Sequence, residues 1–540
     1  MNKKFNISML AVAAGLTLSG VTSCSDPDDA VTSAQFERIF SPIEVKASAY
    51  QSNGVKLTWE DVRVPAESYY VELFADDPNK SFSGNPSKSF TITNADGDAI
   101  EHSYTLKSGL EGSTDYSVRM KARRGTNEST WTTLVFKTGT EQLLDIDPDY
   151  TISGESAQVT MSWPKGISVD KLTVEKSGET IQDITLSDTE KTNGICTITG
   201  LNANTSYTFY LFNGEKQRGK LNFKLANYIE VNDASTMQGA IDAATDGDII
   251  MLTNDIDFTA IETSSLKVNK SLIFKTNCGA TLKGVYFQIN EGASTLEFTK
   301  IKFDGRGGTG DQAFNYKEKG NYEKLYIHDC EVTGYTKGIL YINVAAYIKD
   351  ITFSNCLIHE VCYAGDDGSG NPGGDMFDSR AGGFDALNIT NSTIYNCALK
   401  RDFIRMDDAS SAVSCLAAVT VDHCTLYNVG SGNANYRLLY LRFANNSTTW
   451  TNNLIAGTNN KRGYSNQSAT NEPIFKNNIY YNTVNLISAG ETADPTIVFF
   501  DKDGREITSN PFKDADNADF TVIDATVNDK EAGDTRWIQY

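Results

Sequence analysis

Four short segments in the C-terminal half of the chain carry the residue types best suited to chemistry. They align as Leu340-Tyr-Ile-Asn343, Phe377-Asp-Ser-Arg380, Ile404-Arg-Met-Asp407 and Leu439-Tyr-Leu-Arg442. If each segment is a strand of a repeated coil, β-alternation sends every second side chain outward. One outward column then holds Tyr341, Asp378, Arg405 and Tyr440, and the other holds Asn343, Arg380, Asp407 and Arg442.

These columns predict a groove for an acidic, uronic-acid-containing, pectin-like polysaccharide. Aromatic faces suit the C–H surfaces of sugars, and the arginine fork binds carboxylates in a bidentate manner. The predicted glycan-binding residues are Tyr341, Asn343, Asp378, Arg405, Asp407 and Tyr440. A cross-strand ladder of ion pairs, which only stabilises the fold, explains the alternation of arginine and aspartate equally well.

A polysaccharide lyase on the same surface is a second hypothesis. β-Elimination needs a base beside the uronate carboxylate and a positive group that neutralises this carboxylate. Arg405 is the candidate base, Arg380 or Arg442 the neutralising group, and Lys400 or Arg401 an assisting cation. Calcium would neutralise the carboxylate instead if Asp378, Asp407 and Asp408 held it, because carboxylate oxygens suit this ion. No other cofactor is indicated.

The composition limits the remaining classes of function. The 540 residues predict about three or four domains. Asp plus Glu number 69 against 48 for Lys plus Arg, a formal charge of −21, so a nucleic-acid partner is not expected. With four histidines and no CxxC or HExxH pair, a zinc centre is not expected either.

A repeat shows how distant segments come to lie side by side. Six segments share one register, and their third positions recur at intervals of 25 to 36 residues, namely Asp329, Asn355, Asn391, His423, Asn452 and Asn477. Such intervals are typical of solenoid coils, whose equivalent positions stack about 4.8 Å apart. We therefore expect a ladder of hydrogen-bonded side chains that includes His423. Cys330, Cys356 and Cys424 form the next column, as small buried side chains or as disulfide partners.

The start of the repeat is marked by a helix. The segment 232–247 places Met237, Ala240, Ile241 and Ala244 on one helical face, with Ser235 and Gln238 as a capping box. Its "AIDAATDGDIIML" stretch resembles the N-terminal cap and first strand of right-handed parallel β-helix lyases of the pectate-lyase-like, chondroitinase B-like type. This resemblance implies the fold and not a reaction.

Two segments before the repeat show the period-two alternation of half-buried strands. Residues 42–140 place a tyrosine-corner sequence at Leu110–Tyr116 after Trp59, and residues 144–226 repeat both landmarks at Trp163 and Tyr207. They resemble fibronectin type III modules, whose common role in tandem is that of spacers. The expected fold is all-β: two fibronectin type III-like sandwiches, then a right-handed single-stranded parallel β-helix over residues 228–540 with an N-terminal capping helix.

The N-terminus predicts export. Two lysines precede the apolar run Ile7–Leu18, and Val21-Thr-Ser-Cys24 resembles a bacterial lipobox, which implies a signal peptide at 1–23 and acylation of Cys24. The acidic stretch that opens the linker 24–41 resembles the surface-export tag of Bacteroidetes lipoproteins. A periplasmic lipoprotein is the alternative.

The C-terminal segments Asn510–Phe520 and Gly533–Trp537 resemble the end of a Bacteroidetes domain family of unknown function, found in proteins related to pectate lyases. The sequence therefore predicts a lipoprotein, held by its lipid anchor on the outer face of the outer membrane. There it would bind acidic polysaccharide beside a glycan-uptake transporter complex. A lyase and a structural or adhesive surface protein remain the alternatives.

Overall fold

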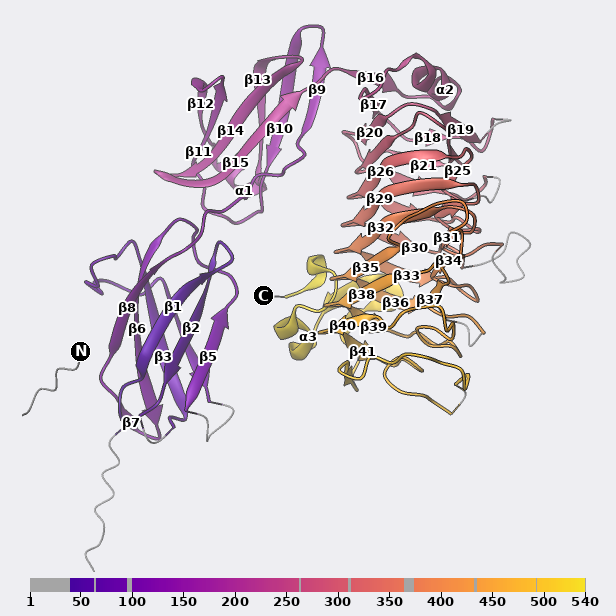
Figure 1. The fold of residues 1–540 in the computed structure, drawn as a ribbon. Coiled ribbons are helices and arrows are strands. Elements are labelled where there is room, and N and C mark those ends of the chain that lie inside the picture. Colours follow the sequence, from indigo (N-terminus) through magenta and orange to yellow (C-terminus); the bar gives the residue numbers. More distant parts are fainter. Residues whose placement is uncertain are drawn as a thin grey trace, which may run out of the picture. The chain divides into compact units, whose positions relative to one another are not determined.

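The computed structural model describes residues 39–62, 65–94, 100–261, 264–308, 312–363, 373–431, 435–491 and 493–539. The fold is all-β as predicted, with two sandwiches followed by a parallel β-helix (Figure 1). The predicted signal peptide, Cys24 and nearly all of the predicted linker lie outside the described residues. No helix within the described ranges is long and apolar enough to cross a membrane.

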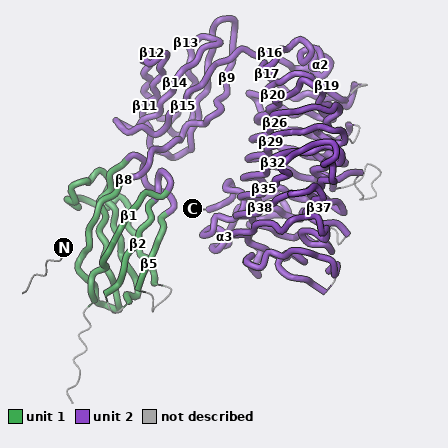
Figure 2. The backbone as a smooth tube through the Cα atoms, in the orientation of Figure 1, with its two compact units in different colours: residues 1–50, 55–106, 114–137 green, residues 51–54, 107–113, 138–540 purple. Residues whose placement is uncertain are grey.

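The first sandwich forms one of two compact units, shown in green in Figure 2. Its strands are β1 (Ile43–Tyr50), β2 (Gly54–Glu60) and β5 (Glu101–Leu106) in one sheet, and β4 (Lys88–Thr93), β3 (Ser68–Ala75), β6 (Asp115–Arg124), β7 (Asn127–Glu128) and β8 (Thr132–Lys137) in the other. Trp59, Val71 and Val118 are buried between the two sheets, in the predicted alternation.

The second sandwich repeats this strand order inside the larger unit. One sheet holds β9 (Asp149–Ser153), β10 (Ser156–Ser162) and β13 (Ile195–Asn202); the other holds β11 (Lys171–Lys176), β12 (Glu179–Thr185), β14 (Thr205–Asn213) and β15 (Lys216–Leu225), with α1 (Asp188–Asn193) between β12 and β13. Trp163 is buried, and the Tyr207 hydroxyl accepts a hydrogen bond from the Asn202 N–H at 2.9 Å. A tyrosine corner is defined by such a bond from the tyrosine hydroxyl to upstream backbone, so the predicted corner at Tyr207 is confirmed.

The β-helix is built of three parallel sheets, here called A, B and C. Sheet A contains β16 (Tyr228–Val231), β17 (Ile249–Leu252), β20 (Leu272–Thr276), β23 (Thr295–Thr299), β26 (Gly320–His328), β29 (Ala346–Ser354), β32 (Gly383–Thr390), β35 (Ala418–Asp422), β38 (Ser447–Thr451) and β40 (Ile474–Lys476). Sheet B contains β18 (Ile256–Asp257), β21 (Thr281–Lys283), β24 (Lys302–Asp304), β27 (Glu331–Thr333), β30 (Leu357–His359), β33 (Thr393–Cys397), β36 (Thr425–Val429), β39 (Leu454–Ala456), β41 (Ile479–Tyr481) and β42 (Arg505–Ile507). Sheet C contains β19 (Ser265–Val268), β22 (Tyr286–Ile289), β25 (Phe314–Tyr316), β28 (Leu340–Ile342), β31 (Phe377–Ser379), β34 (Ile404–Met406) and β37 (Leu439–Leu441).

The predicted repeat positions form the corner between sheets A and B. All six have φ between 45° and 57°, the left-handed region that asparagine and aspartate tolerate better than most residues. The Asn391 amide donates to Asn355 at 3.3 Å, and the Asn477 amide donates to Asn452 at 2.8 Å. The predicted ladder thus exists in two stretches.

His423 interrupts this ladder, so its predicted ladder hydrogen bond is wrong. Its Nδ1 lies 2.8 Å from Asp422 Oδ2 on the preceding residue, and the Asn452 amide reaches past it to Asp422 Oδ1 at 2.9 Å. The ring is bonded to this neighbouring carboxylate instead of to the next coil.

The stacked cysteines are free thiols. Cys330, Cys356 and Cys424 are buried, and burial raises the pKa of each thiol. Ser392 continues the column, and its hydroxyl accepts a hydrogen bond from the Cys356 N–H at 3.0 Å. The expectation of small buried side chains is confirmed.

The helix α2 (Ala234–Ala243) covers the first coil, with Met237 and Ile241 fully buried. The predicted capping box of Ser235 and Gln238 is wrong, because Asp233 is the N-cap and accepts a hydrogen bond from the Ser235 N–H at 2.8 Å. Gln238 instead accepts from the Lys267 N–H at 2.9 Å and donates to the Lys267 carbonyl at 3.0 Å. Its amide therefore ties the helix to β19.

The chain after residue 510, here called the C-terminal segment, packs on the outer face of sheet B. It contains β43 (Phe512–Asp514), the 3-10 helix η1 (Ala515–Asn517), β44 (Asp519–Val522), α3 (Ala525–Lys530) and the 3-10 helix η2 (Thr535–Trp537). The Phe520 ring centroid lies 5.1 Å from that of Tyr395 and 5.6 Å from that of Tyr427. An apolar cluster outside the coil results.

Candidate functional site

The strands of sheet C align the candidate residues in the predicted register. Tyr341 pairs with Asp378, Asp378 with Arg405, and Arg405 with Tyr440. Backbone hydrogen bonds of 2.8 Å from the N–H groups of Arg380, Asp407 and Arg442 continue the ladder into the second column. Asn343 is exposed just beyond the end of β28.

A third column lies two residues before the start of each strand and was missed when the four strand segments were aligned with one another. It consists of Asp375, Asp402 and Arg437: the Asp402 N–H donates to Asp375 Oδ1 at 3.2 Å, and the Arg437 N–H donates to Asp402 Oδ1 at 3.1 Å. Three successive coils therefore carry polar residues at i, i+3 and i+5, a spacing visible in the sequence. We call these nine positions the array: Asp375, Asp378, Arg380, Asp402, Arg405, Asp407, Arg437, Tyr440 and Arg442.

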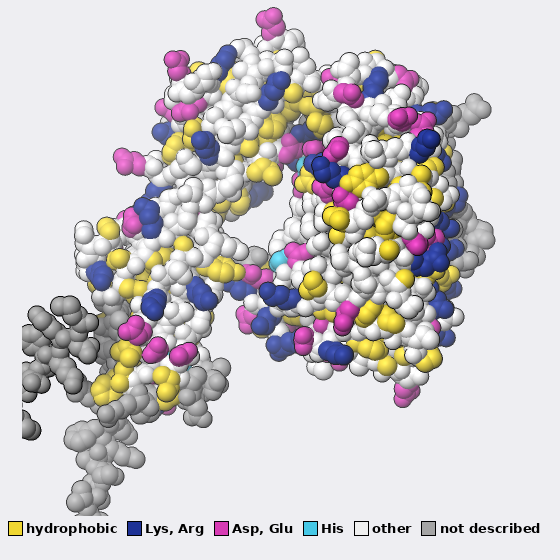
Figure 3. Space-filling model, in the orientation of Figure 1, with side chains coloured by type: hydrophobic (Ala, Val, Ile, Leu, Met, Phe, Trp, Pro, Cys, Tyr) yellow, Lys and Arg dark blue, Asp and Glu magenta, His cyan; other side chains and the backbone are white. Residues whose placement is uncertain are grey.

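The array is layered, with carboxylates below guanidinium groups. The side chains of Asp378 and Asp375 are 0% and 2% exposed, whereas those of Arg380 and Arg442 are 34% and 42% exposed. Figure 3 shows basic side chains next to acidic ones at the edge of the β-helix that carries β31, β34 and β37. The surface thus presents guanidinium groups whose carboxylate partners are mostly buried.

Hydrogen-bonded ion pairs hold these layers together. Arg380 Nη2 lies 2.7 Å from Asp378 Oδ2. Arg405 is bidentate on Asp407, at 3.1 Å from Nε and 2.9 Å from Nη2, and its Nη1 lies 3.1 Å from Asp375. Arg442 Nη2 lies 3.2 Å from Asp407, so this carboxylate receives two arginines.

The tyrosines differ in how much of each ring is covered. The guanidinium carbons of Arg437, Arg405 and Arg442 lie 4.4, 5.1 and 5.3 Å from the Tyr440 ring centroid. Tyr341 has one such neighbour, Arg380, at 5.8 Å. Tyr440 is therefore enclosed by cations, and Tyr341 is the better placed of the two to contact a ligand with its ring face.

The contacts of Arg405 argue against its predicted role as catalytic base. Burial by itself would lower the pKa of its guanidinium, but the hydrogen bonds and charges of Asp407 and Asp375 outweigh burial and raise this pKa above its ordinary value. A base must first lose its proton, which is unfavourable for a cation held by two carboxylates. Lys400, the predicted assisting cation, is exposed in the turn between β33 and β34, where its N–H donates to the Ser431 carbonyl at 3.3 Å.

The predicted calcium site is also wrong. Arg380 covers Asp378, two arginines occupy Asp407, and Asp408 is an exposed residue that accepts a hydrogen bond from the Ser410 N–H at 3.1 Å. Over the described ranges no group of three or more His, Cys, Asp or Glu side chains is arranged to hold a metal ion. Because Asp378 is fully buried, its predicted direct contact with a glycan is wrong as well.

Two groups of the third column have shifted pKa values. Burial raises the pKa of Asp402 to about 6. Burial and the nearby charge of Arg462 lower the pKa of Arg437, although Asp402 opposes this change. The Arg437 Nε, 3.2 Å from Asp402, is buried without a hydrogen bond of good geometry. This end of the array therefore holds a guanidinium that is incompletely satisfied.

Three segments match known domain families. Residues 40–137 match the fibronectin type III domain, residues 252–397 match "Domain of unknown function (DUF4957)", and residues 419–537 match "Domain of unknown function (DUF5123)". The chain contains a fibronectin type III domain and two domains of unknown function. The array spans both of the latter, since β31 falls in the first and β37 in the second. None of the curated protein sequences matches the chain.

Solved structures of fibronectin type III segments and of a designed β-sandwich resemble part of the chain. A two-domain fibronectin type III segment from chicken tenascin is 15% identical, with 34% of this chain and 97% of that chain covered and a TM-score of 0.25. The FN1–FN3 domains of chicken CNTN1 are 17% identical, with 34% and 62% covered and a TM-score of 0.15. A redesigned β-sandwich protein is 24% identical, with 19% and 92% covered and a TM-score of 0.16.

Proposed function

We propose that the outer face of sheet C binds an acidic, carboxylate-bearing polysaccharide without cleaving it. The observation that carries this proposal is the layering of the array, in which buried aspartates fix partly exposed arginines. Each arginine has five N–H donors, and the aspartates beneath Arg380 and Arg442 use only some of them. The remaining donors are available to a carboxylate.

The aspartates fix the orientation of the guanidinium groups and leave the proposed site with little net charge. Four arginines and four aspartates cancel in the array, so net attraction for a polyanion is small. A guanidinium held in one orientation loses less side-chain entropy when a ligand binds, and its planar fork selects carboxylates by shape. We therefore expect selective binding of moderate affinity.

The spacing of the exposed groups suits a polymer that runs across the strands. Arg380 and Arg442 lie two coils apart, about 10 Å at the usual strand separation, a distance comparable to one disaccharide unit. Tyr341 lies one coil before Arg380 on the same face. A chain laid along this line would meet an aromatic ring and then two guanidinium groups.

Binding is a better proposal than β-elimination because the array offers no free base. Arg405, the central cation, has a raised pKa and is held by Asp407 and Asp375. Hydrogen-bonded guanidinium groups bind and orient a carboxylate without accepting a proton.

The remaining predictions complete the proposed role. Cys24, at the end of the lipobox-like sequence, would carry a lipid that anchors the protein to the outer membrane of a Bacteroidetes cell, and the sandwiches would serve as spacers. The bound glycan would pass to an outer-membrane uptake complex. The motifs of the N-terminus support this placement.

Affinity electrophoresis of the full chain in polygalacturonate, rhamnogalacturonan, alginate and chondroitin tests the proposal, with neutral dextran as the reference gel. We expect retardation by at least one polyuronate, and the pair of substitutions Arg380→Gln and Arg442→Gln should reduce affinity at least about tenfold. Lys349→Gln, which removes one positive charge at an exposed lysine of sheet A, is the control for charge loss outside the array and should bind normally.

The same samples are checked for unsaturated product by ultraviolet absorbance. Product formation would overturn the non-catalytic proposal. Absence of retardation in every acidic gel would overturn the proposed glycan site.

A further inference from the structure

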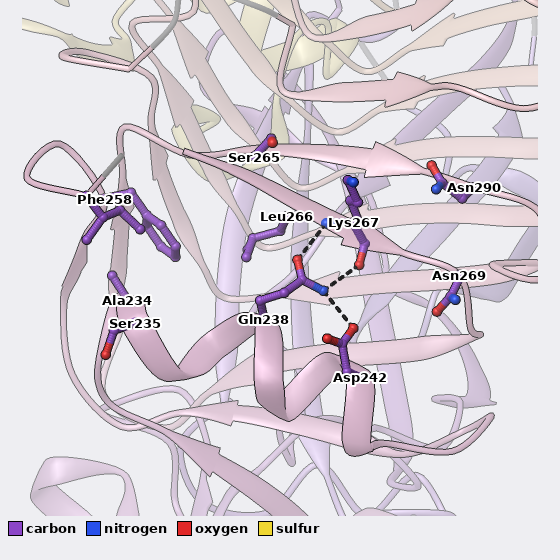
Figure 4. A pocket seen from close by; sticks show the side chains of 11 residues that line it. Ala234, Ser235, Gln238, Asp242, Phe258, Ser265, Leu266, Lys267, Asn269 and Asn290 are labelled. Atoms are coloured by element: carbon purple, nitrogen blue, oxygen red, sulfur yellow. Dashed lines mark hydrogen bonds between the residues drawn. The ribbon is translucent and has the colours of Figure 1, made fainter. Parts of the chain in front are cut away.

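A pocket at the N-terminal end of sheet C lies apart from the array. It has a volume of about 600 Å³ and lies between α2, the turn after β18, and strands β19 and β22. This volume is within the usual range for small-molecule sites. Figure 4 shows Phe258 at one side of the pocket, with Lys267, Asn269 and Asn290 at the other.

The structure fixes the walls of this pocket. Gln238 bonds both the backbone of Lys267 and, at 2.9 Å, the Asp242 carboxylate, so its own amide is fully used. Gly292 holds the opposite turn against β19: its φ is 99°, and a Cβ there would lie 2.3 Å from the Asn269 carbonyl oxygen. Phe258 and Leu266 supply a rigid apolar part of the lining.

Several polar groups around the pocket remain unused. The Lys267 ammonium and the side chains of Ser265 and Asn269 have no hydrogen bond or ion pair to any of the described residues. Asn290 Oδ1 is buried without a hydrogen-bond partner. An amide oxygen buried without a donor costs stability. The exposed Lys267 and Asn269 are the polar side chains that a ligand in the pocket can reach.

We propose that this pocket binds a single neutral sugar ring. Asp242 and Lys267 cancel in charge, which favours a neutral ligand over an acid or an amine. The unused groups are hydroxyl, amide and ammonium groups, which suit the many hydroxyls of a sugar, and the partly exposed Ile261 supplies an apolar contact for its C–H face. The site is separate from the acidic-glycan site, and either could exist without the other.

Ligand-observed saturation-transfer NMR on the full chain tests this inference. The probes are the methyl glycosides of galactose, glucose, rhamnose and arabinose, and we expect transfer to at least one of them. Ser265→Tyr, which fills the pocket from β19, should abolish this transfer. Asn269→Leu, which removes an exposed amide from the lining of the pocket, should reduce it at least fivefold.

Three controls make the result decisive. Thermal unfolding of each variant verifies the fold, and Lys267→Met replaces any variant that does not fold. Arg442→Gln, which changes only the proposed acidic-glycan site, should leave the transfer unchanged. The two proposed sites can therefore be tested separately. The inference is overturned if none of the four glycosides shows transfer, or if transfer persists in Ser265→Tyr.

Discussion

Sheets B and C have the same strand geometry, but their outward side chains have different surroundings. Each has an outward column that includes tyrosines: Tyr395 and Tyr427 on sheet B, and Tyr341 and Tyr440 on sheet C. On sheet B the rings pack against Phe512 and Phe520 of the C-terminal segment. On sheet C they lie beside guanidinium groups. What covers an outward column decides whether it stabilises the fold or remains available to a ligand.

The two faces also differ in how they are closed. Asp534 of the C-terminal segment is fully buried and accepts a hydrogen bond from the Thr393 hydroxyl at 2.7 Å, and Trp537 donates to the same hydroxyl at 2.7 Å. Sheet B is thus sealed by the chain's own residues. On sheet C the side chains of Arg380 and Arg442 are 34% and 42% exposed.

The largest effect is expected from a substitution in the C-terminal segment that covers sheet B. Phe520→Ala should lower the free energy of unfolding by about 4 kcal/mol, because this fully buried ring contacts both outward tyrosines and would leave a cavity. Urea unfolding measures the loss, and Phe520→Leu should lose clearly less. Glycan retardation should persist wherever the variant is folded. An unchanged stability would contradict the sealing role of the C-terminal segment.

On sheet C, the pH dependence of the free energy of unfolding should reflect the titration of Asp402. Its pKa in the folded chain is about 6, whereas an unfolded aspartate titrates near 4, so the folded state binds more protons between these values. The stability from this group is fully present below about pH 4 and is lost as the pH rises through about 6, by at most about 3 kcal/mol.

Urea unfolding between pH 4.5 and 7.5 tests this sign. In Asp402→Asn, the decrease in the free energy of unfolding that this carboxyl causes as the pH rises should be absent. Asp408→Asn, at an exposed position, should retain this decrease. Equal slopes in the parent chain and in Asp402→Asn would show that this carboxyl does not titrate as expected.

Matched tyrosine substitutions sharpen the comparison directly. Tyr395→Ala should cost about 2 kcal/mol of stability, because its ring packs on Phe520, and should leave glycan binding intact. Tyr341→Ala should weaken retention by polyuronate about fivefold with little change in stability. Urea unfolding and affinity electrophoresis of both variants provide the two readouts. If Tyr395→Ala weakened glycan binding and Tyr341→Ala lowered stability, sheet B would be the binding face and sheet C the stabilising one.

The smallest effect concerns the corner after sheet B. Asn396, Asn428, Gly457 and Asn482 occupy equivalent places in successive coils, all with positive φ. Asn428→Ala should cost about 1 kcal/mol, because alanine disfavours the left-handed region, and Asn428→Gly should cost less. Thermal unfolding compares the two. If alanine were tolerated better than glycine, backbone conformation would not explain the asparagines.

The comparison also shows where sequence reasoning stopped. The coil spacing correctly aligned Tyr341, Asp378, Arg405 and Tyr440 on neighbouring strands. It missed Asp375, Asp402 and Arg437, because they precede the strands and the alignment began at the first apolar residue of each. It also assigned Arg405 a role as base, since the number of carboxylates around a guanidinium depends on contacts between coils.

The sequence by itself determined the periodic part of the molecule. Alternating apolar residues, recurring corner asparagines and the coil intervals are local features, and each is tied to a backbone geometry that only a few residue types adopt. Only the tertiary structure decided which outward column the C-terminal segment covers and which carboxylates lie beneath guanidinium groups. Those outcomes depend on contacts such as Thr393 with Asp534, between residues 141 positions apart, and chain spacing carries no record of where such distant side chains meet.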